Sequence, residues 1–310
     1  MAKVFIDGSA GTTGLRIHER LQNRPELELI ILDEQHRKDE DARRAAINSA
    51  DIAFLCLPDT AAIEAVSMID NPNTVVIDTS TAHRTADGWT YGFPELTGQK
   101  EKIKSSKRIA NPGCHASGFI SLVAPLVEKG LLSPDSSLSC FSLTGYSGGG
   151  KKMIADYEMT ENATSLLAPR MYGLGQSHKH LPEMAKVCGL TKDPIFCPIV
   201  SSYYAGMEVT VSLFAEDVNG SIEDIKNIYK NYYTGSLVRF VDGADENGFV
   251  SASIKAGADD MQISVFGNKQ RILLVSRFDN LGKGASGAAI QNMNLVLGLD
   301  ETAGLSISEV

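Results

Sequence analysis

Short apolar runs alternate with helix-like segments through the first third of the chain. The apolar runs predict strands at residues 3–7, 27–32, 51–57 and 74–78. Helical spacing predicts helices at about 15–21, 41–48 and 61–69. Because the apolar residues follow one another instead of alternating with polar ones, the strands are expected in a parallel sheet that helices cover on both faces. This pattern predicts an α/β fold with a doubly wound, Rossmann-type dinucleotide-binding domain.

The pattern changes after residue 129. Strands are expected at 136–146 and 203–214 and as a pair within 261–279, and helices at 116–129, 222–232 and 285–299. A chain of 310 residues exceeds the size at which a single core usually stops growing, so two domains are expected. Residues 1–112, completed by a C-terminal helical segment at 283–310, are predicted to bind the dinucleotide. Residues 113–282 are predicted to form an α+β domain for substrate binding and dimerisation.

A glycine-rich loop, Gly8-Ser9-Ala10-Gly11-Thr12-Thr13-Gly14, joins the first strand to the first helix. Glycines at its first, fourth and seventh positions let backbone N–H groups approach a pyrophosphate at the start of the helix. The spacing is a variant of the usual G-x-G-x-x-G fingerprint, and a purely structural turn is the alternative. The candidate cofactor-binding residues of the loop are Gly8, Ala10, Gly11, Thr12, Thr13 and Gly14. Ser80 follows the fourth strand, where polar residues bind ligands or cap helices.

The residues after the second strand bear on the choice of coenzyme. Asp33 occupies the position where an acid holds the ribose 2′-hydroxyl of NAD. Arg37 and Lys38, which follow, are basic groups of the kind that holds the 2′-phosphate of NADP. Both kinds of group are present, so the residues leave the choice open.

Cys114 lies where an extended stretch meets the helix expected at 116–129. Free N–H groups and the positive end of the helix dipole favour a thiolate over a thiol at such a place. Pro112 and Gly113 shape a tight turn that can present the side chain outward. Cys114 is therefore the candidate nucleophile, and a small buried side chain is the alternative.

A nucleophilic cysteine needs an acid or base within reach, and the chain has six histidines. His18 on the first helix and His36 in a charged loop are set aside. His115 is also set aside, because neighbouring residues on a helix diverge by about 100° and cannot face one another. His83 remains, together with His178 and His180 in what reads as an extended run. Catalytic acid/base work is the expectation for the pair, and solvated loop histidines are the alternative. The pair could also bind a metal, but no further ligand at a suitable spacing completes such a site, and no metal is expected.

Composition limits the partners. The five cysteines are odd in number and widely scattered, so neither a disulfide framework nor a zinc cage is indicated. A net charge of −9 argues against a nucleic-acid surface, while local Arg and Lys can still bind a small anion. No apolar run approaches the roughly 20 residues of a membrane span. The chain also enters its first strand without a signal-like stretch, so a cytoplasmic protein is expected.

Several motifs, taken together, point to a family. They lie at residues 8–14, 78–84, 91–96, 111–114, 147–152, 175–183 and 279–292. With them the chain resembles, nearly end to end, the N-acetyl-γ-glutamyl-phosphate reductases of arginine biosynthesis, in particular their shorter branch, within the aspartate-semialdehyde dehydrogenase superfamily. One segment departs from the family, because longer members carry Ala-Asp-Phe-Arg where this chain has Thr81-Ala82-His83-Arg84.

The resemblance implies an NADP-dependent reductive dephosphorylation of an acyl phosphate through a cysteine thioester. It implies that Cys114 is the nucleophile and that His180 is the acid and base, with His178 in support. It also implies that Asn292, in the last helix, contacts the nicotinamide. A homodimer or homotetramer is expected.

The substrate is expected to be a small polyanion, so positive groups should gather at its site. Arg84 adjoins the motif after the fourth strand. Lys151 and Lys152 end a segment, 147–152, that reads as a flexible or anion-embracing loop. These three residues are the candidates for substrate binding.

Two alternatives remain. Aspartate-semialdehyde dehydrogenase would use the same cysteine and histidine with β-aspartyl phosphate, although the run at 178–183 looks like the reductase branch. A non-catalytic NADP-sensing Rossmann protein would keep the glycine loop and would have no need of Cys114 or His180.

Overall fold

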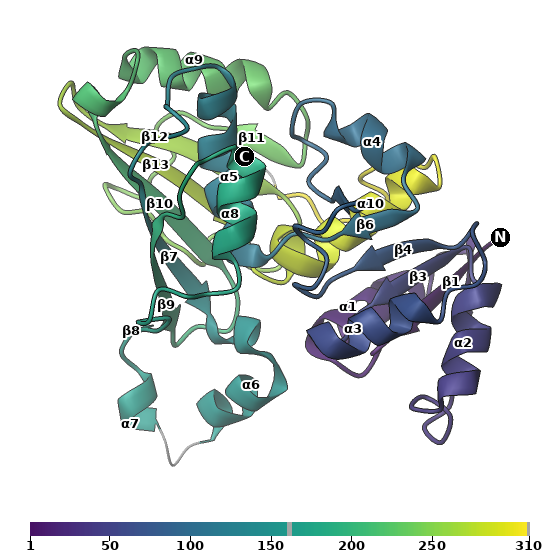
Figure 1. Cartoon of the computed structure of the whole chain (residues 1–310). Helices are drawn as coiled ribbons and strands as arrows, with labels where there is room; N and C mark the ends of the chain where they lie inside the picture. The colour runs from purple at the N-terminus through teal and green to yellow at the C-terminus, as the bar shows by residue number, and fades with distance from the viewer. Residues whose placement is uncertain (160–162, 309–310) are drawn as a thin grey trace. The chain divides into compact units, whose positions relative to one another are not determined.

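The structure, a computed structural model, describes residues 1–159 and 163–308. It divides into two compact units, which are Met1–Pro112 with Ala285–Leu305, and Gly113–Gly284 with the residues from Ser306 onward (Figure 1). Each unit is built around one β-sheet.

The C-terminal segment expected at 283–310 is divided between the units. The first unit holds Ala285–Leu305, and residues 309 and 310 lie outside the described part of the chain. The last described residues are bound by the second unit. Ser306 donates its N–H to the Asp259 carboxylate at 2.9 Å, and Ser308 donates its N–H to the Asp260 carboxylate at 3.0 Å.

The sheet of the first unit is parallel throughout, as the consecutive apolar runs predict. Its strands run in the order β2-β1-β3-β4-β6-β5. They are β1 (Ala2–Asp7), β2 (Leu27–Ile30), β3 (Ile52–Leu55), β4 (Val75–Asp78), β5 (Thr90–Tyr91) and β6 (Arg108–Ala110). Since the strand order reverses at β1, the carboxyl end of that strand is where such sheets bind ligands.

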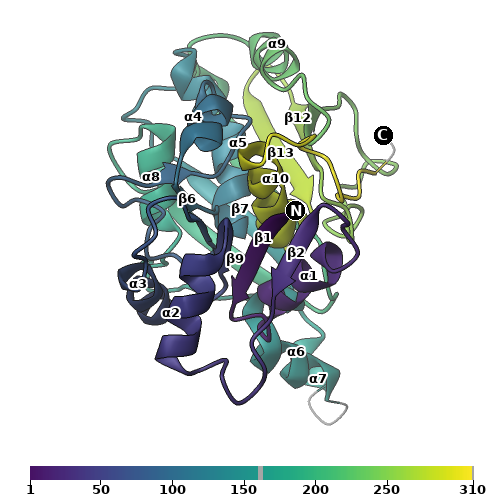
Figure 2. The same ribbon diagram turned by 90° about the vertical axis from the view of Figure 1, so that its right-hand side faces the viewer.

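Helices cover both faces of this sheet (Figure 2). They are α1 (Thr12–Leu21), α2 (Glu40–Ser49), α3 (Asp59–Ser67), α4 (Gln99–Ser105) and α10 (Gly287–Val296). One core cluster joins α1 and α10 to the sheet through buried Ile17 and Ile290. A second cluster, with Ile47 and Ala65, joins α2 and α3 to the opposite face.

The second unit has a mixed seven-stranded sheet in the order β11-β12-β13-β10-β7-β9-β8. Its strands are β7 (Ser139–Gly145), β8 (Arg170–Met171), β9 (Ile195–Ser201), β10 (Met207–Phe214), β11 (Val238–Phe240), β12 (Met261–Gly267) and β13 (Arg271–Phe278). Its helices are α5 (Cys114–Glu128), α6 (Gly150–Glu158), α7 (Ala163–Leu166), α8 (Leu181–Cys188) and α9 (Ile222–Tyr232).

Helix α5 packs closely on one face of this sheet. Its Gly118 faces Val209 of β10 and Ser276 of β13, and side chains along nearly its whole length are buried. The alternate residues of the strands point to the other face, and several large apolar ones there are exposed. They are Phe141, Ile195, Phe214 and Leu273, which we call the open-face residues.

The expectation of a loop at 147–152 is wrong. A short 3₁₀ turn, Tyr146–Gly149, leads directly into α6, so Lys151 and Lys152 lie in the first turn of a helix. Gly150 has a φ of +73°, which turns the chain, and the residues after it are mostly good helix formers. The glycines therefore redirect the chain without leaving a loop around an anion.

Gly118→Ala is predicted to destabilise the protein. A Cβ atom there would lie 2.4 Å from Val209 Cγ2 and 2.8 Å from Val209 Cβ. Overpacking of this kind costs about 1–3 kcal/mol, more than the gain of up to about 1 kcal/mol that alanine brings to a helix. Urea unfolding should show a net loss of about 1–2 kcal/mol.

Gly235→Ala is the matched control, because no heavy atom lies within 4 Å of its Cβ position. Equal stability of the two variants would contradict the close packing of α5 on the sheet.

Candidate active site

The glycine loop has the shape that an anion site at a helix start requires. Gly8 has a φ of +84°, and a Cβ atom there would lie 2.3 Å from the Cys56 carbonyl oxygen. A Cβ atom at Gly14 would lie 2.4 Å from the Gly8 oxygen. Gly11 is the N-cap of α1 and offers no side-chain cap. The first N–H groups of the helix, from Thr12 onward, have no carbonyl partner within it and are suited to an anion.

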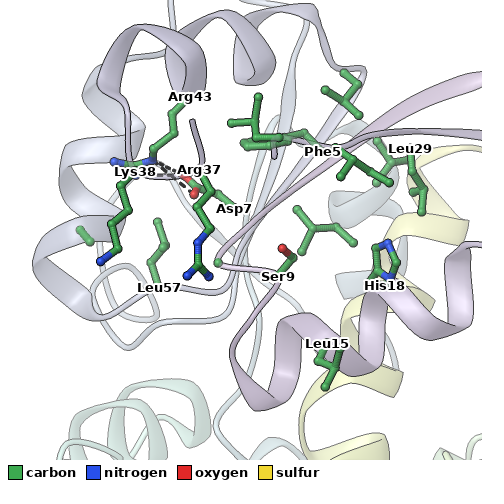
Figure 3. A pocket seen from close by; sticks show the side chains of 17 residues that line it. Phe5, Asp7, Ser9, Leu15, His18, Leu29, Arg37, Lys38, Arg43 and Leu57 are labelled. Carbon is green, nitrogen blue, oxygen red and sulfur yellow. Dashed lines mark hydrogen bonds and ion pairs between the residues drawn. The ribbon is translucent and has the colours of Figure 1, made fainter. Parts of the chain in front are cut away.

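A cavity of about 500 Å³ lies beside this loop, over the ends of β1 and β2 (Figure 3). Arg37, Lys38 and Arg43 line one part of it, near Ser9. Arg43 is held by the Asp7 carboxylate, with its Nη2 2.9 Å from Oδ2. Burial raises the pKa of Asp7, and the hydrogen bond and charge of Arg43 oppose that rise. The cavity therefore presents basic groups next to a phosphate-binding loop.

Asp33 is not among the residues that line this cavity. Its Oδ1 accepts the N–H groups of Gln35 at 3.0 Å and His36 at 2.9 Å, and it lies 2.8 Å from His36 Nδ1. The backbone hydrogen bond of His36, above all, lowers the pKa of Asp33. The carboxylate thus caps its own turn, while Arg37 and Lys38 reach the cavity.

Ser80 and His83 are held together by one buried carboxylate. Ser80 Oγ donates to Asp78 Oδ2 at 2.7 Å, and His83 Nδ1 lies 2.7 Å from the same oxygen. The His83 ring also stacks on Trp89, with centroids 4.1 Å apart. His83 therefore has a structural place within the first unit.

The backbone before Cys114 is tied to the first unit by side chains. Arg84 donates through Nε to the Asn111 carbonyl at 3.0 Å and through Nη2 to the Thr79 carbonyl at 3.0 Å. Asn292 is fully buried and donates through Nδ2 to the Gly92 carbonyl at 3.0 Å. Two of the predicted ligand residues, Arg84 and Asn292, therefore also anchor the chain.

Cys114 is the first residue of α5, as its sequence context predicts. Its N-cap is Gly113, which supplies no side chain, and the first turn of the helix contains no acidic residue. A Cβ atom at Gly284 would lie 2.9 Å from the Cys114 Cβ, so a residue with a side chain at position 284 would clash with Cys114. The thiol is partly buried at an uncapped helix start, which favours the thiolate.

A buried carboxylate joins the cysteine turn to a histidine. Glu183 Oε2 accepts the N–H of Gly113 at 3.2 Å. Its other oxygen, Oε1, lies 3.9 Å from His180 Nε2. His180 is the N-cap of α8, so both groups are placed by the start of that helix.

The expectation of an extended run at His178 and His180 is wrong, because the chain turns there into α8. The N–H of His180 points to His178 Nδ1 at 3.3 Å, and the two rings meet edge to face at 4.8 Å. Burial, with the charge of Lys179 second, lowers the pKa of His178. In the part of the chain that the structure describes, no group of three side chains could hold a metal ion.

His115, set aside in the sequence, lies in the middle of this group. Its ring centroid is 5.5 Å from that of His180 and 6.0 Å from that of His178. It also contacts Tyr172 and Ser142 through both ring nitrogens. The His115 side chain leaves the helix in a different direction from that of Cys114, but it still contacts the group that holds His178 and His180.

Lys151 and Lys152 are exposed on α6, a helix without buried residues. Neither side chain forms a hydrogen bond or ion pair with another residue of the described ranges. Cys114, His178 and His180 are brought together in one unit, and the cofactor candidates gather in the other. The sequence reasoning missed Tyr172, for which no local signal existed, and gave Glu183 no role although it stands in a recognised motif.

Comparisons with known proteins identify the family. The model described as "Semialdehyde dehydrogenase, NAD binding domain" matches residues 3–106, and "Semialdehyde dehydrogenase, dimerisation domain" matches 114–280. The chain is 43% identical to N-acetyl-gamma-glutamyl-phosphate reductase 2 of Nostoc sp., over 98% of this chain and 99% of the relative. It is 45% identical to the N-acetyl-gamma-glutamyl-phosphate reductase of Brucella suis, over 96% and 99%. The chain belongs to the semialdehyde dehydrogenase family.

Within the semialdehyde dehydrogenases the chain groups with the N-acetyl-gamma-glutamyl-phosphate reductases, so the predicted resemblance and the predicted oxidoreductase class are confirmed. Its fold is that of the crystal structure of aspartate semialdehyde dehydrogenase II of Vibrio cholerae, with a TM-score of 0.74 at 17% identity, over 96% of this chain and 98% of that one. The predicted fold class is thereby confirmed. Among the described residues, no helix has the length and apolar character to cross a membrane.

Proposed function

We propose that the chain reduces N-acetyl-glutamyl 5-phosphate, with NADPH, to N-acetyl-glutamate 5-semialdehyde and phosphate, a step of arginine biosynthesis. The names of relatives at 43% and 45% identity support the substrate. The observation that carries the chemistry is a cysteine at an uncapped helix start, beside a histidine and a buried glutamate. A non-catalytic NADP sensor, the alternative, would not need Cys114, His180 and Glu183 in this arrangement.

Cys114 is the nucleophile in this proposal. Its sulfur attacks the acyl carbon, a C–S bond forms, and the bond to the phosphate oxygen breaks, which leaves a thioester. When bound, NADPH supplies the hydride that reduces the thioester carbonyl. His180 takes back the hydroxyl proton of the resulting thiohemiacetal as the C=O bond forms and the C–S bond breaks, so the aldehyde leaves with the thiolate restored.

His180 moves the protons. It accepts the Cys114 proton before attack and protonates the oxygen of the reduced acyl carbon afterwards. Glu183 orients the ring, since its Oε1 lies 3.9 Å from His180 Nε2 while its Oε2 binds the turn before Cys114. His178 supports His180 from the preceding turn, where its Nδ1 is occupied by a backbone N–H.

NADP is the proposed coenzyme. The loop from Gly8 to Gly14, through Ala10, Gly11, Thr12 and Thr13, would hold the pyrophosphate, and side chains at Gly8 or Gly14 would clash with backbone. Arg37 and Lys38 line the neighbouring cavity and would hold the 2′-phosphate, whereas Asp33 caps its own turn. Asn292 and Ser80 are proposed to contact the nicotinamide side.

Three basic residues are proposed for the substrate's phosphate and carboxylate. Arg84 donates hydrogen bonds through Nε and Nη2 to backbone carbonyls, so its charge would be held in a fixed position. Lys151 and Lys152 are exposed at the first turn of α6, where a helix start also favours an anion. An acetylated amine carries no charge, so this substrate needs no acidic partner for an ammonium group.

The chain is proposed to act as a homodimer or homotetramer. Its second unit matches a family model described as a dimerisation domain. The open-face residues support a sheet surface as the contact, because Phe141 is 41% and Ile195 63% exposed. Large apolar side chains gathered on one face are typical of protein interfaces.

The reverse reaction tests the substrate assignment. With phosphate and NADP, N-acetyl-glutamate semialdehyde is expected to react with a kcat/KM at least about 10²-fold above that of aspartate semialdehyde, because a site built for a neutral amide disfavours an ammonium group. Comparable rates, or a preference for aspartate semialdehyde, would contradict the arginine-pathway substrate and leave the cysteine chemistry intact.

His180→Asn is predicted to lower kcat by about 10²–10⁴-fold, since it removes the proton carrier, and to abolish the ascending limb of the pH–rate profile. His178→Asn is the matched control and should keep that limb with a smaller loss. Equal, mild effects of the two substitutions would instead indicate that both histidines bind the substrate and that neither transfers a proton.

Removing the positive charges beside the cavity tests the coenzyme. Arg37→Ala combined with Lys38→Ala should reduce the preference for NADPH over NADH by about tenfold or more, because charge-assisted hydrogen bonds to the 2′-phosphate are lost. The preference is measured as the ratio of kcat/KM for the two coenzymes. Asp33→Asn, which removes the charge and keeps an oxygen that can cap the turn, serves as the control and should leave the ratio unchanged. A wild-type preference for NADH would overturn the assignment.

A further inference from the structure

Both histidines of the proposed catalytic group lie on one segment that leaves the sheet. This segment, residues 172–180, joins β8 to α8 and belongs with both to the second unit. Its start is tied to β9, because the Tyr172 N–H donates to the Pro198 carbonyl at 3.0 Å. From Gly173 to Lys179, the described chain has no main-chain hydrogen bond to that strand. Strand pairing therefore does not fix the part of the segment that leads to the histidines.

A glutamine side chain replaces the strand pairing there. Gln176 Oε1 accepts the N–H of Phe196 at 2.9 Å, and Gln176 Nε2 donates to the carbonyl of the same residue at 2.7 Å. Phe196 lies on β9, and β8 pairs with that strand further on, at Ile199 and Val200. Since a main-chain N–H donates and a carbonyl accepts, the two ends of the amide can be assigned in one way. We call this two-point contact the amide clamp.

The backbone at Gln176 would suit a different residue. Its φ is +50°, in the left-handed region that glycine adopts most readily and asparagine next. Glycine has no amide, and the amide of asparagine is one methylene shorter than that of glutamine. A strained conformation persists where the surrounding contacts determine it. At this position the contacts are the amide clamp and the N–H of Gln176, which donates to the Gly173 carbonyl at 3.0 Å.

The clamped residue of β9 also contacts the histidines. The ring centroid of Phe196 is 5.1 Å from that of His178 and 5.2 Å from that of His115. His178 follows Gln176 by two residues, and its Nδ1 lies 3.3 Å from the N–H of His180. Phe196 is therefore bound to the segment twice, through its main chain to Gln176 and through its ring to His178.

We propose that Gln176 is a positioning residue, which fixes the segment 172–180 on β9 and so sets where the imidazoles of His178 and His180 lie. The amide clamp holds one side of the segment, and the start of α8 holds the other. The importance of Gln176 for turnover rests on the proposed proton transfer by His180.

The first test is an NMR titration of the His178 ring in the labelled protein, without substrate or coenzyme. Burial, with the charge of Lys179 second, lowers the pKa of this histidine. A loosened segment would expose the ring to water, so its pKa should rise when the clamp is removed. The side chains whose rings lie around it are Tyr172, His115, His180 and Phe196.

Two variants separate the clamp from the backbone strain. Gln176→Met keeps the length of the side chain and removes both hydrogen bonds, and Gln176→Gly removes the bonds and relieves the strain. Each should raise the pKa of His178 by about half a pH unit or more. Gln270→Ala is the control, because that exposed side chain forms no hydrogen bond within the described residues. A wild-type pKa of His178 in either Gln176 variant would overturn the proposal.

Turnover separates positioning from stability alone. At a temperature where every variant is folded, Gln176→Met should lower kcat by about tenfold and leave KM within about twofold, since a misplaced proton carrier slows the chemical step. A lower Tm with a wild-type kcat would show that the clamp only stabilises the fold, and would overturn the proposal. If the wild-type protein itself fails to reduce N-acetyl-glutamyl 5-phosphate, the proposed function fails, and the NMR titration still decides whether Gln176 positions the segment.

Discussion

One buried carboxylate connects the parts of the proposed catalytic group. Glu183 is almost fully enclosed, and burying a charge is unfavourable unless polar groups surround it. One of its oxygens binds the N–H of Gly113, at the start of α5, and the other stands 3.9 Å from His180 Nε2. The turn that carries Cys114 and the histidine that serves it are therefore held by the same side chain. The starts of two helices, α5 and α8, meet at this residue.

The helix starts also explain why the site needs so few charged groups. At Cys114 the dipole of α5 favours negative charge, since the helix start has no side-chain cap and no acidic residue in its first turn. In the first unit the start of α1 offers the same environment to a pyrophosphate beside Gly11. An acidic protein with a net charge of −9 can thus handle anions at two places where its backbone supplies the attraction.

Much of the fold could be predicted because its signals are local. The apolar runs of β3 and β4 reflect strands buried on both faces, and the glycines of residues 8–14 reflect backbone that no other residue would fit. Cys114 could be found for the same reason, since a proline, a glycine and a following helix are neighbours in sequence. The prediction of a loop at 147–152 is wrong, because glycines are typical of open loops, whereas here they turn the chain directly into α6.

The partners of the site could not be predicted, because they are distant in sequence. Ser142 and Tyr172 lie 27 and 57 residues from His115, and only the pairing of β7 and β9 with the segment around β8 brings them together. The choice between Asp33 and the basic residues after it was likewise open until the turn geometry showed which of them reach the cavity. In both cases the answer depends on the direction of the side chains, which the spacing of residues in the sequence does not specify.

The central claim is that Cys114 forms an acyl enzyme, and a trapped intermediate tests it most directly. The protein is mixed with N-acetyl-glutamyl 5-phosphate without coenzyme, quenched in acid and analysed by mass spectrometry of its peptides. The account predicts one N-acetyl-glutamyl group on the Cys114 peptide, absent from Cys114→Ser and lost when NADPH is added before the quench. An adduct on another residue, or turnover with no adduct on Cys114, would contradict it.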